Sequence, residues 1–142
     1  MNKIIVLSLA FLLFVPLAGA LEVNPKQTQN ITLQPEQSET VSYSLELNKS
    51  QEEVTVSSTN TGNYMVFFSQ TSFSSDGDLN AMVKAPSQGN YTHTLSVNFE
   101  STYETTTNNT TTTETENKIR EIKATTEIPF DRVRSTWINT SN

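Results

Sequence analysis

The residue pattern in this sequence best suited to chemistry is the N-glycosylation sequon, Asn-X-Ser/Thr with X other than Pro. In an exported protein, a glycan can be joined to the side-chain amide of such an asparagine. Some sequons are expected by chance, because the chain is rich in Asn, Ser and Thr. All of them nevertheless fall in predicted turns, in a threonine tract or near a terminus, so we expect a glycan on at least one. The sequons are Asn30, Asn48, Asn90, Asn108, Asn109 and Asn139.

Residues that could act as catalytic acids, bases or nucleophiles are sparse. His93 is the single histidine, and it falls on the inward face of a predicted strand, where we expect a structural role. Glu52 and Glu53 are adjacent, so on a strand they point to opposite faces and do not form the carboxylate pair of a glycosidase. No nucleophile elbow, phosphate-binding loop or zinc-protease motif is present. We therefore predict no catalytic residues and no enzymatic activity.

Ligands for a metal or a cofactor are also sparse. One histidine and no cysteine cannot supply a histidine or cysteine cluster. Asp76-Gly77-Asp78 resembles a fragment of a calcium loop, but an EF-hand spreads its ligands over a longer loop, so we predict a polar turn. We expect no metal and no cofactor. Most aromatic residues lie in the inward phase of predicted strands, which favours core packing; Trp137 lies outside any patterned strand and could pack on the body or on a partner.

The first twenty residues have the features of a secretory signal peptide. Lys3 provides the positive start, residues 4–15 are almost continuously apolar, and small residues at Ala18 and Ala20 suit a cleavage site. The apolar run is shorter than the roughly 20 residues that a membrane-spanning helix needs. We predict cleavage after Ala20, an extracellular or cell-surface location and no membrane span after cleavage; the alternative is an uncleaved N-terminal anchor.

Charge and cysteine content exclude some partners and restrict the origin. The formal net charge is −6, and the few basic residues are scattered, so no footprint for nucleic acid exists. Small secreted eukaryotic domains usually carry disulfides, and this chain has no cysteine. The composition therefore favours a prokaryotic, including archaeal, or viral origin, or else a fold that buries enough core without disulfides.

Period-two alternation of apolar and polar residues predicts β-strands through most of the chain. It is clearest over residues 91–103, and it recurs at 41–47, 54–58 and 79–85, with turn residues between these segments. Residues 64–68 are apolar on both faces, which predicts a central strand. Strands at this spacing indicate an all-β sandwich whose body covers residues 21–103.

Threonine dominates residues 104–117, which follow the clearest strand. One interpretation is a long β-hairpin with its tip near Asn108-Asn109, since Thr is a good strand residue and alternation resumes at 122–130. The other is a flexible, mucin-like linker. We favour the hairpin, and assign residues 118–142 to the last strand and a tail.

Three segments together resemble the immunoglobulin-like accessory domains of archaeal and bacterial surface proteins. They are Leu33-Gln34-Pro35-Glu36, the strand 41–47, and Ala85-Pro86-Ser87-Gln88-Gly89-Asn90-Tyr91 before a long strand. The resemblance covers about residues 24–103. The first turn lacks the glycine that is common after its proline, and the threonine-rich hairpin is additional. The resemblance implies an adhesive, spacer or assembly role.

The leading prediction is therefore an exported, N-glycosylated structural or interaction module of a cell or virion surface, whose partner is a surface protein or a glycan. One alternative is a subunit of an S-layer, a filament or a virion surface, which would form oligomers through the hairpin or the tail. Another alternative is a carbohydrate-binding module.

Overall fold

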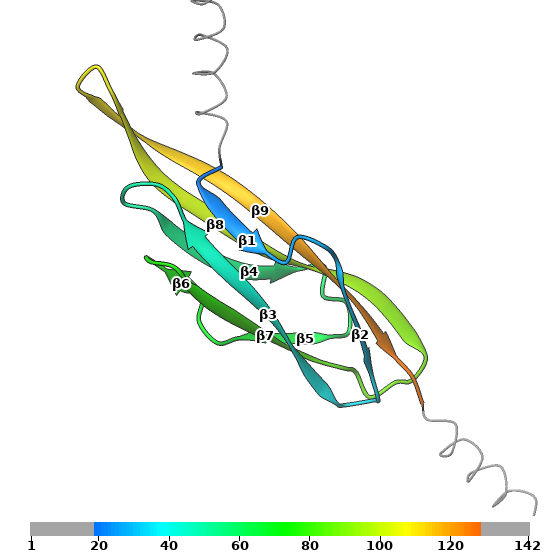
Figure 1. The fold of residues 1–142 in the computed structure, drawn as a ribbon. Coiled ribbons are helices and arrows are strands. Elements are labelled where there is room, and N and C mark those ends of the chain that lie inside the picture. Colours follow the sequence, from blue (N-terminus) through cyan, green and yellow to red (C-terminus); the bar gives the residue numbers. More distant parts are fainter. Residues whose placement is uncertain (1–18, 129–142) are drawn as a thin grey trace, which may run out of the picture.

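The structure is a computed structural model and describes residues 19–128, which form two packed β-sheets (Figure 1). The described residues contain no helix, and none therefore that is long and apolar enough to cross a membrane. The strands are β1 (Leu21–Asn24), β2 (Gln29–Leu33), β3 (Ser38–Leu47), β4 (Glu53–Thr59), β5 (Met65–Phe68), β6 (Ser72–Phe73), β7 (Gly77–Lys84), β8 (Tyr91–Thr107) and β9 (Thr110–Thr126).

The strand order is that of an immunoglobulin-like sandwich. Sheet A has the order β1-β3-β7-β5, and sheet B has the order β2-β9-β8-β4-β6. The immunoglobulin fold places its strands A, B, E and D in one sheet and C, F and G in the other. Sheet A reproduces the first set, and β4, β8 and β9 reproduce the second. The predicted fold class, an all-β immunoglobulin-like sandwich, is confirmed.

The core forms where the inward faces of the two sheets meet. Strands β3 and β7 alternate between buried and exposed positions, and β8 between buried and mostly half-buried ones, in the phase that their sequences predict. Tyr43 of β3 and Phe99 of β8 meet in the centre, with ring centroids 5.8 Å apart and an interplanar angle of 73°. This edge-to-face packing is a favoured aromatic geometry. The period-two pattern thus fixes which side of each strand enters the core.

Strands β8 and β9 form the long threonine-rich hairpin that the sequence predicts. They pair without interruption from Tyr91↔Thr126 to Thr107↔Thr110. Asn108 and Asn109 form the two-residue turn with φ angles of 52° and 63°. Positive φ at both positions is the geometry of a type I′ turn, which asparagine tolerates better than most residues. Residues 104–117 therefore belong to two paired strands and not to a linker.

The prediction of a central strand at residues 64–68 is wrong. Strand β5 lies at the edge of sheet A, where β7 is its one neighbour (Figure 1). Val66 and Phe68 are half-buried and pack against the core, whereas Met65 and Phe67 point outward and are 53% and 45% exposed. Apolar residues on both faces of a strand thus do not require neighbouring strands on both sides.

One further position departs from the sequence prediction. Asn30 lies within β2 and pairs with Lys123, so this sequon is in an edge strand and not in a turn. Ala20, the predicted cleavage position, is fully buried, and its carbonyl accepts a hydrogen bond of 2.9 Å from the Asn48 amide. Residues 1–18 and 129–142 lie outside the described part, and with them most of the leader, Asn139 and Trp137.

Candidate functional site

The outer part of the β8–β9 hairpin extends beyond its neighbouring strands. Strand β4 pairs with β8 no further than Thr102, and β2 pairs with β9 only from Ile122 onward. Residues 103–114, called here the hairpin arm, therefore have strand pairing only with each other (Figure 1). Every arm residue except Tyr103 is exposed. The arm presents polar side chains and two unpaired backbone edges to solvent.

A buried carboxylate fixes the base of the arm. Glu52 is 4% exposed and accepts hydrogen bonds from the backbone amides of Asn48, at 2.8 Å, and Lys49, at 3.0 Å. The hydroxyl of Ser101, on β8, donates to the other carboxylate oxygen. These contacts join the β3–β4 turn to the long hairpin. Burial of a charge is tolerated because each oxygen is hydrogen-bonded.

A second carboxylate ties the start of the described chain to β9. Glu116 accepts a hydrogen bond of 3.1 Å from the Ala20 amide and lies 3.2 Å from the Lys118 ammonium. The amide of Ala20, and then Lys118, lower the pKa of the Glu116 carboxyl. Further along β9, Arg120 donates to the Val23 carbonyl at 2.9 and 3.2 Å. Side chains of β9 thus bind the backbone of the first described residues and of β1.

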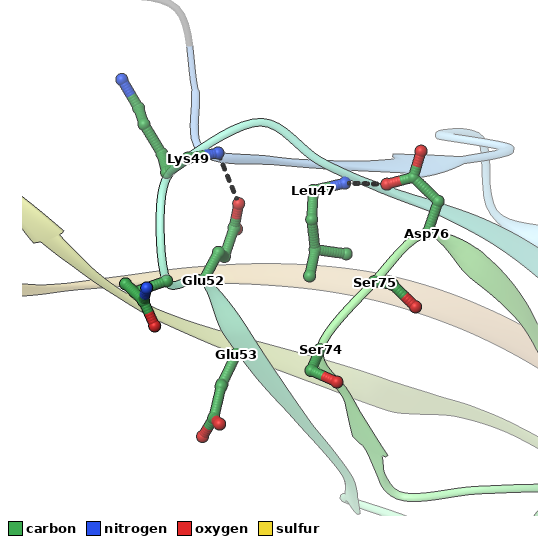
Figure 2. Close-up of a pocket in the computed structure, with 8 residues that line it drawn as sticks. Leu47, Lys49, Glu52, Glu53, Ser74, Ser75 and Asp76 are labelled. Carbon is green, nitrogen blue, oxygen red and sulfur yellow. Dashed lines mark hydrogen bonds between the residues drawn. The ribbon is translucent and has the colours of Figure 1, made fainter.

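An open pocket lies beside the base of the arm, between the β3–β4 turn and the loop before β7. It has a volume of about 610 Å³ and is lined in part by Lys49, Glu52, Glu53 and Asp76. Figure 2 shows the Glu52 and Glu53 side chains pointing away from each other, as expected for adjacent residues. Asp76 accepts a hydrogen bond of 2.8 Å from the Leu47 amide. The carboxylates of Glu52 and Asp76 therefore hold backbone amides of the fold. The described residues contain no group of acids and histidine that could hold a metal.

His93 lies at the other end of the sandwich and is half-buried. Its ring stacks on Tyr91 with centroids 5.9 Å apart, and Tyr91 in turn stacks on Tyr64. The Nε2 atom is 2.7 Å from the Asn60 carbonyl, to which an N–H can donate. Gly62, with φ 60°, fits tightly here, because an added Cβ would lie 2.6 Å from the Tyr91 hydroxyl. In this arrangement the histidine holds the loop between β4 and β5.

The sequon asparagines within the described residues are all exposed, and they lie around the periphery of the sandwich. One is on the edge strand β2, one in the β3–β4 turn, one in the β7–β8 turn and two at the tip of the arm. They are Asn30, Asn48, Asn90, Asn108 and Asn109. None lies on the outer face of sheet A.

Exposed apolar residues on that same face were not predicted from the sequence. Met65, Phe67 and Met82 are 53%, 45% and 40% exposed, and Phe67 pairs directly with Met82. The sequence around β5 shows an apolar segment between two polar turns, and this pattern predicts a strand in the interior. Nothing in the sequence predicted the contact of Glu52 with Ser101 or that of Arg120 with Val23 either, because these partners are far away along the chain.

No protein-family model matches the chain, and no curated protein matches it. Among solved structures, the chain is similar to the Vibrio cholerae VesB protease, with 11% identity, a TM-score of 0.47 and coverage of 75% of this chain and 32% of that chain. It is also similar to PapD-like domain 7 of human CEP192, with 11% identity, a TM-score of 0.45 and coverage of 78% and 87%. The chain spans about a third of the protease. These likenesses concern the fold alone and carry no argument about function. The narrower resemblance to archaeal and bacterial surface proteins stays a prediction.

Proposed function

We propose that the protein is an exported, N-glycosylated and non-catalytic structural or interaction module of a cell or virion surface. One observation supports this proposal above the others. Each sequon asparagine within residues 19–128 has an exposed side chain on the periphery of the sandwich. A bulky, solvated glycan can be attached at such a position without displacing packed residues.

The hairpin arm also suits a solvated surface role. Unpaired strand edges tend to pair with other chains, and proteins protect them with charge, short length or covering groups. The arm carries Glu104 and Glu114 beside its threonines, and both asparagines at its tip are sequons. Charge along the edges and sugar at the tip would keep the arm free of unspecific strand pairing.

The test is secretion of the full-length chain, with its own leader, from a host that performs N-glycosylation. We expect intact-mass and peptide analysis to show a mature chain that begins at Leu21 and carries glycan mass. That mass should fall stepwise as Asn30, Asn48 and Asn90 are changed to Gln. The matched control is Asn98→Gln, on β8 outside any sequon, which should leave the glycan mass unchanged. A full-length chain that is retained in the cell with unmodified sequons would overturn the proposal.

A second candidate function is supported by the order of the arm. Its strands remain paired up to the Asn108-Asn109 turn, although no other strand flanks them. A strand pair with two open edges can add to the sheet of a neighbouring subunit, as an assembly subunit would require. Replacing residues 104–113 by a two-residue Asn-Gly turn should then abolish assembly while the sandwich stays folded by circular dichroism. Unchanged assembly by the shortened protein would refute this role. The carbohydrate-binding alternative stays a prediction.

A further inference from the structure

The outer face of sheet A carries an apolar patch at its β5 edge. Met65 and Phe67 of β5 and Met82 of β7 form this β5 patch, and each is at least 40% exposed. Phe67 and Met82 are direct partners in the β5–β7 register. Exposed apolar residues that cluster in this way, in contrast to scattered ones, mark surfaces for interaction.

The backbone of β5 is also open on the side away from β7. The Ser69 amide donates to the Asn80 carbonyl at 2.9 Å, just beyond the end of the strand. Because hydrogen-bonded pairs alternate in an antiparallel ladder, Phe67 and Met65 direct their backbone groups toward β7. Val66 and Phe68 therefore direct their N–H and C=O groups to the open edge. A strand laid along this edge would satisfy them.

The charge distribution indicates what can approach. Residues 54–75, which include β5 and the loops on either side, contain no Asp, Glu, Lys or Arg. The whole chain carries a net charge of −6, so two copies repel each other over most of their surfaces. The segment that contains β5 adds no charge to this repulsion, and the charged residue registered beside it is Lys84, opposite Met65. Two other exposed edges carry charge, since Glu22 lies on β1 and the arm carries glutamates.

We propose that two copies of the chain associate by antiparallel pairing of their β5 strands, with Phe67 on the two-fold axis. Val66 of each copy would exchange backbone hydrogen bonds with Phe68 of the partner subunit. Phe67 would face Phe67 of the partner subunit as a non-hydrogen-bonded pair, the arrangement in which side chains are closest. The two copies of sheet A would become one continuous sheet, and the two β5 patches one apolar surface. Sequon positions leave this face clear of glycans. The inference goes beyond the proposed function, because it requires neither export nor glycosylation.

The first test uses the absence of cysteine from the chain. In the proposed pairing, a cysteine at Phe67 would face its own copy at a Cα separation of about 4.5 Å, which a disulfide can bridge. We expect the Phe67→Cys protein to form a covalent dimer under mild oxidation. The matched control is Ile119→Cys, which replaces an apolar residue that is 57% exposed on the outer face of sheet B. Equal and slow cross-linking of both variants would overturn the proposal.

The second test measures association without a covalent bond. We expect sedimentation of the wild-type protein to show a dimer fraction that grows as the protein concentration is raised to about 1 mM. Phe67→Lys should raise the dissociation constant about tenfold or more, because it removes a central aromatic residue and places two positive charges opposite each other across the two-fold axis. Ile119→Lys, which adds the same charge on the other sheet, should not. A wild-type monomer at every concentration, or an equal effect of both lysines, would refute the β5 dimer. Either result would leave the test of export and glycosylation unaffected.

Discussion

The hairpin arm and the β5 edge both present unpaired strand backbone to solvent, but their side chains differ. The arm is polar, carries glutamates and ends in two sequons. Strand β5 is four residues long, uncharged and apolar on its outward face. The arm therefore carries charges and sequons that oppose pairing with another strand, whereas β5 is protected only by its short length. The comparison indicates that open backbone alone does not mark a contact surface, and that the side chains beside it do.

The two regions also differ in how they are held to the body. The arm is held at its base, through Glu52 and Ser101 on one side and Glu116 on the other. Strand β5 is held at its start, because the residue before it, Tyr64, places its hydroxyl 2.8 Å from Thr126 Oγ1 and 2.9 Å from the Tyr91 carbonyl. The arm can therefore loosen toward its tip, whereas β5 follows the sandwich. The predictions below test these attachments, from the largest expected effect to the smallest.

Glu52→Ala should destabilise the protein by about 3 kcal/mol. The substitution removes the acceptor of the buried Ser101 hydroxyl and of the Lys49 amide, while the Asn48 amide keeps the Ala20 carbonyl. Urea unfolding followed by circular dichroism measures the loss. The matched control is the adjacent Glu53→Ala, at an exposed position, which should change the free energy of unfolding by less than about 0.5 kcal/mol. Equal effects of the two substitutions would show that Glu52 does not fix the base of the arm.

Tyr64→Phe and Tyr43→Phe should change the stability by different amounts, although each substitution removes one phenolic hydroxyl. The Tyr64 hydroxyl has hydrogen-bond partners on β8 and β9, so its loss should cost about 1–2 kcal/mol and loosen β5. The Tyr43 hydroxyl is buried without a partner among residues 19–128, and burial raises its pKa to about 12. Its removal should be neutral within about 0.5 kcal/mol, or stabilising.

Hydrogen exchange should show whether β5 is held by this contact. In the Tyr64→Phe protein, the amides of Met65 and Phe67, which face β7, should exchange faster, while those of the arm should keep their wild-type rates. Faster exchange in both regions would mean that the substitution loosens the whole sandwich. Thermal unfolding of both phenylalanine variants provides the stability comparison.

Asn109→Ala should weaken the arm without unfolding the body. At a φ of 63°, alanine is disfavoured by about 1–2 kcal/mol, so exchange of arm amides should accelerate by roughly fivefold or more. Asn109→Gly is the matched control, because glycine accepts positive φ and the substitution also removes the sequon. If both variants accelerate exchange equally, loss of the glycan and not backbone strain is the cause.

The sequence predicted the structure of those regions in which a single local rule determines the conformation. Alternation determines which face of β3, β7 and β8 is buried, and paired asparagines between threonine segments determine the position of the hairpin tip. The edge position of β5 was beyond that reasoning, because alternation describes the two faces of a strand and not its neighbours. From the sequence, Glu52 belongs to a polar turn. Its burial depends on Ser101, which donates to its carboxylate and is 49 residues away along the chain. Long-range polar contacts of this kind have no local sequence signal.

Glu116→Gln should produce the smallest effect, and one that depends on pH. The Ala20 amide lowers the pKa of the Glu116 carboxyl below the ordinary value of 4.5. A group with a lowered folded-state pKa contributes stability above its unfolded-state pKa, and the contribution is lost as the pH falls through the folded-state value. In protein that retains Gly19 and Ala20, wild type should thus lose stability from about pH 4.5 downward more steeply than Glu116→Gln.

At pH 7 the Glu116→Gln substitution should cost less than about 1 kcal/mol, because the pair with Lys118 is partly exposed. Urea unfolding at several pH values between 3 and 7 measures both quantities, with Glu114→Gln, nearer the tip, as the control for the loss of one negative charge. Parallel stability curves for wild type and Glu116→Gln would show that this carboxylate does not hold the arm to the chain start. Among the side chains at the base of the arm, Glu52 would then be the one that holds it, and the Glu52→Ala protein should show faster exchange of arm amides while β5 remains protected.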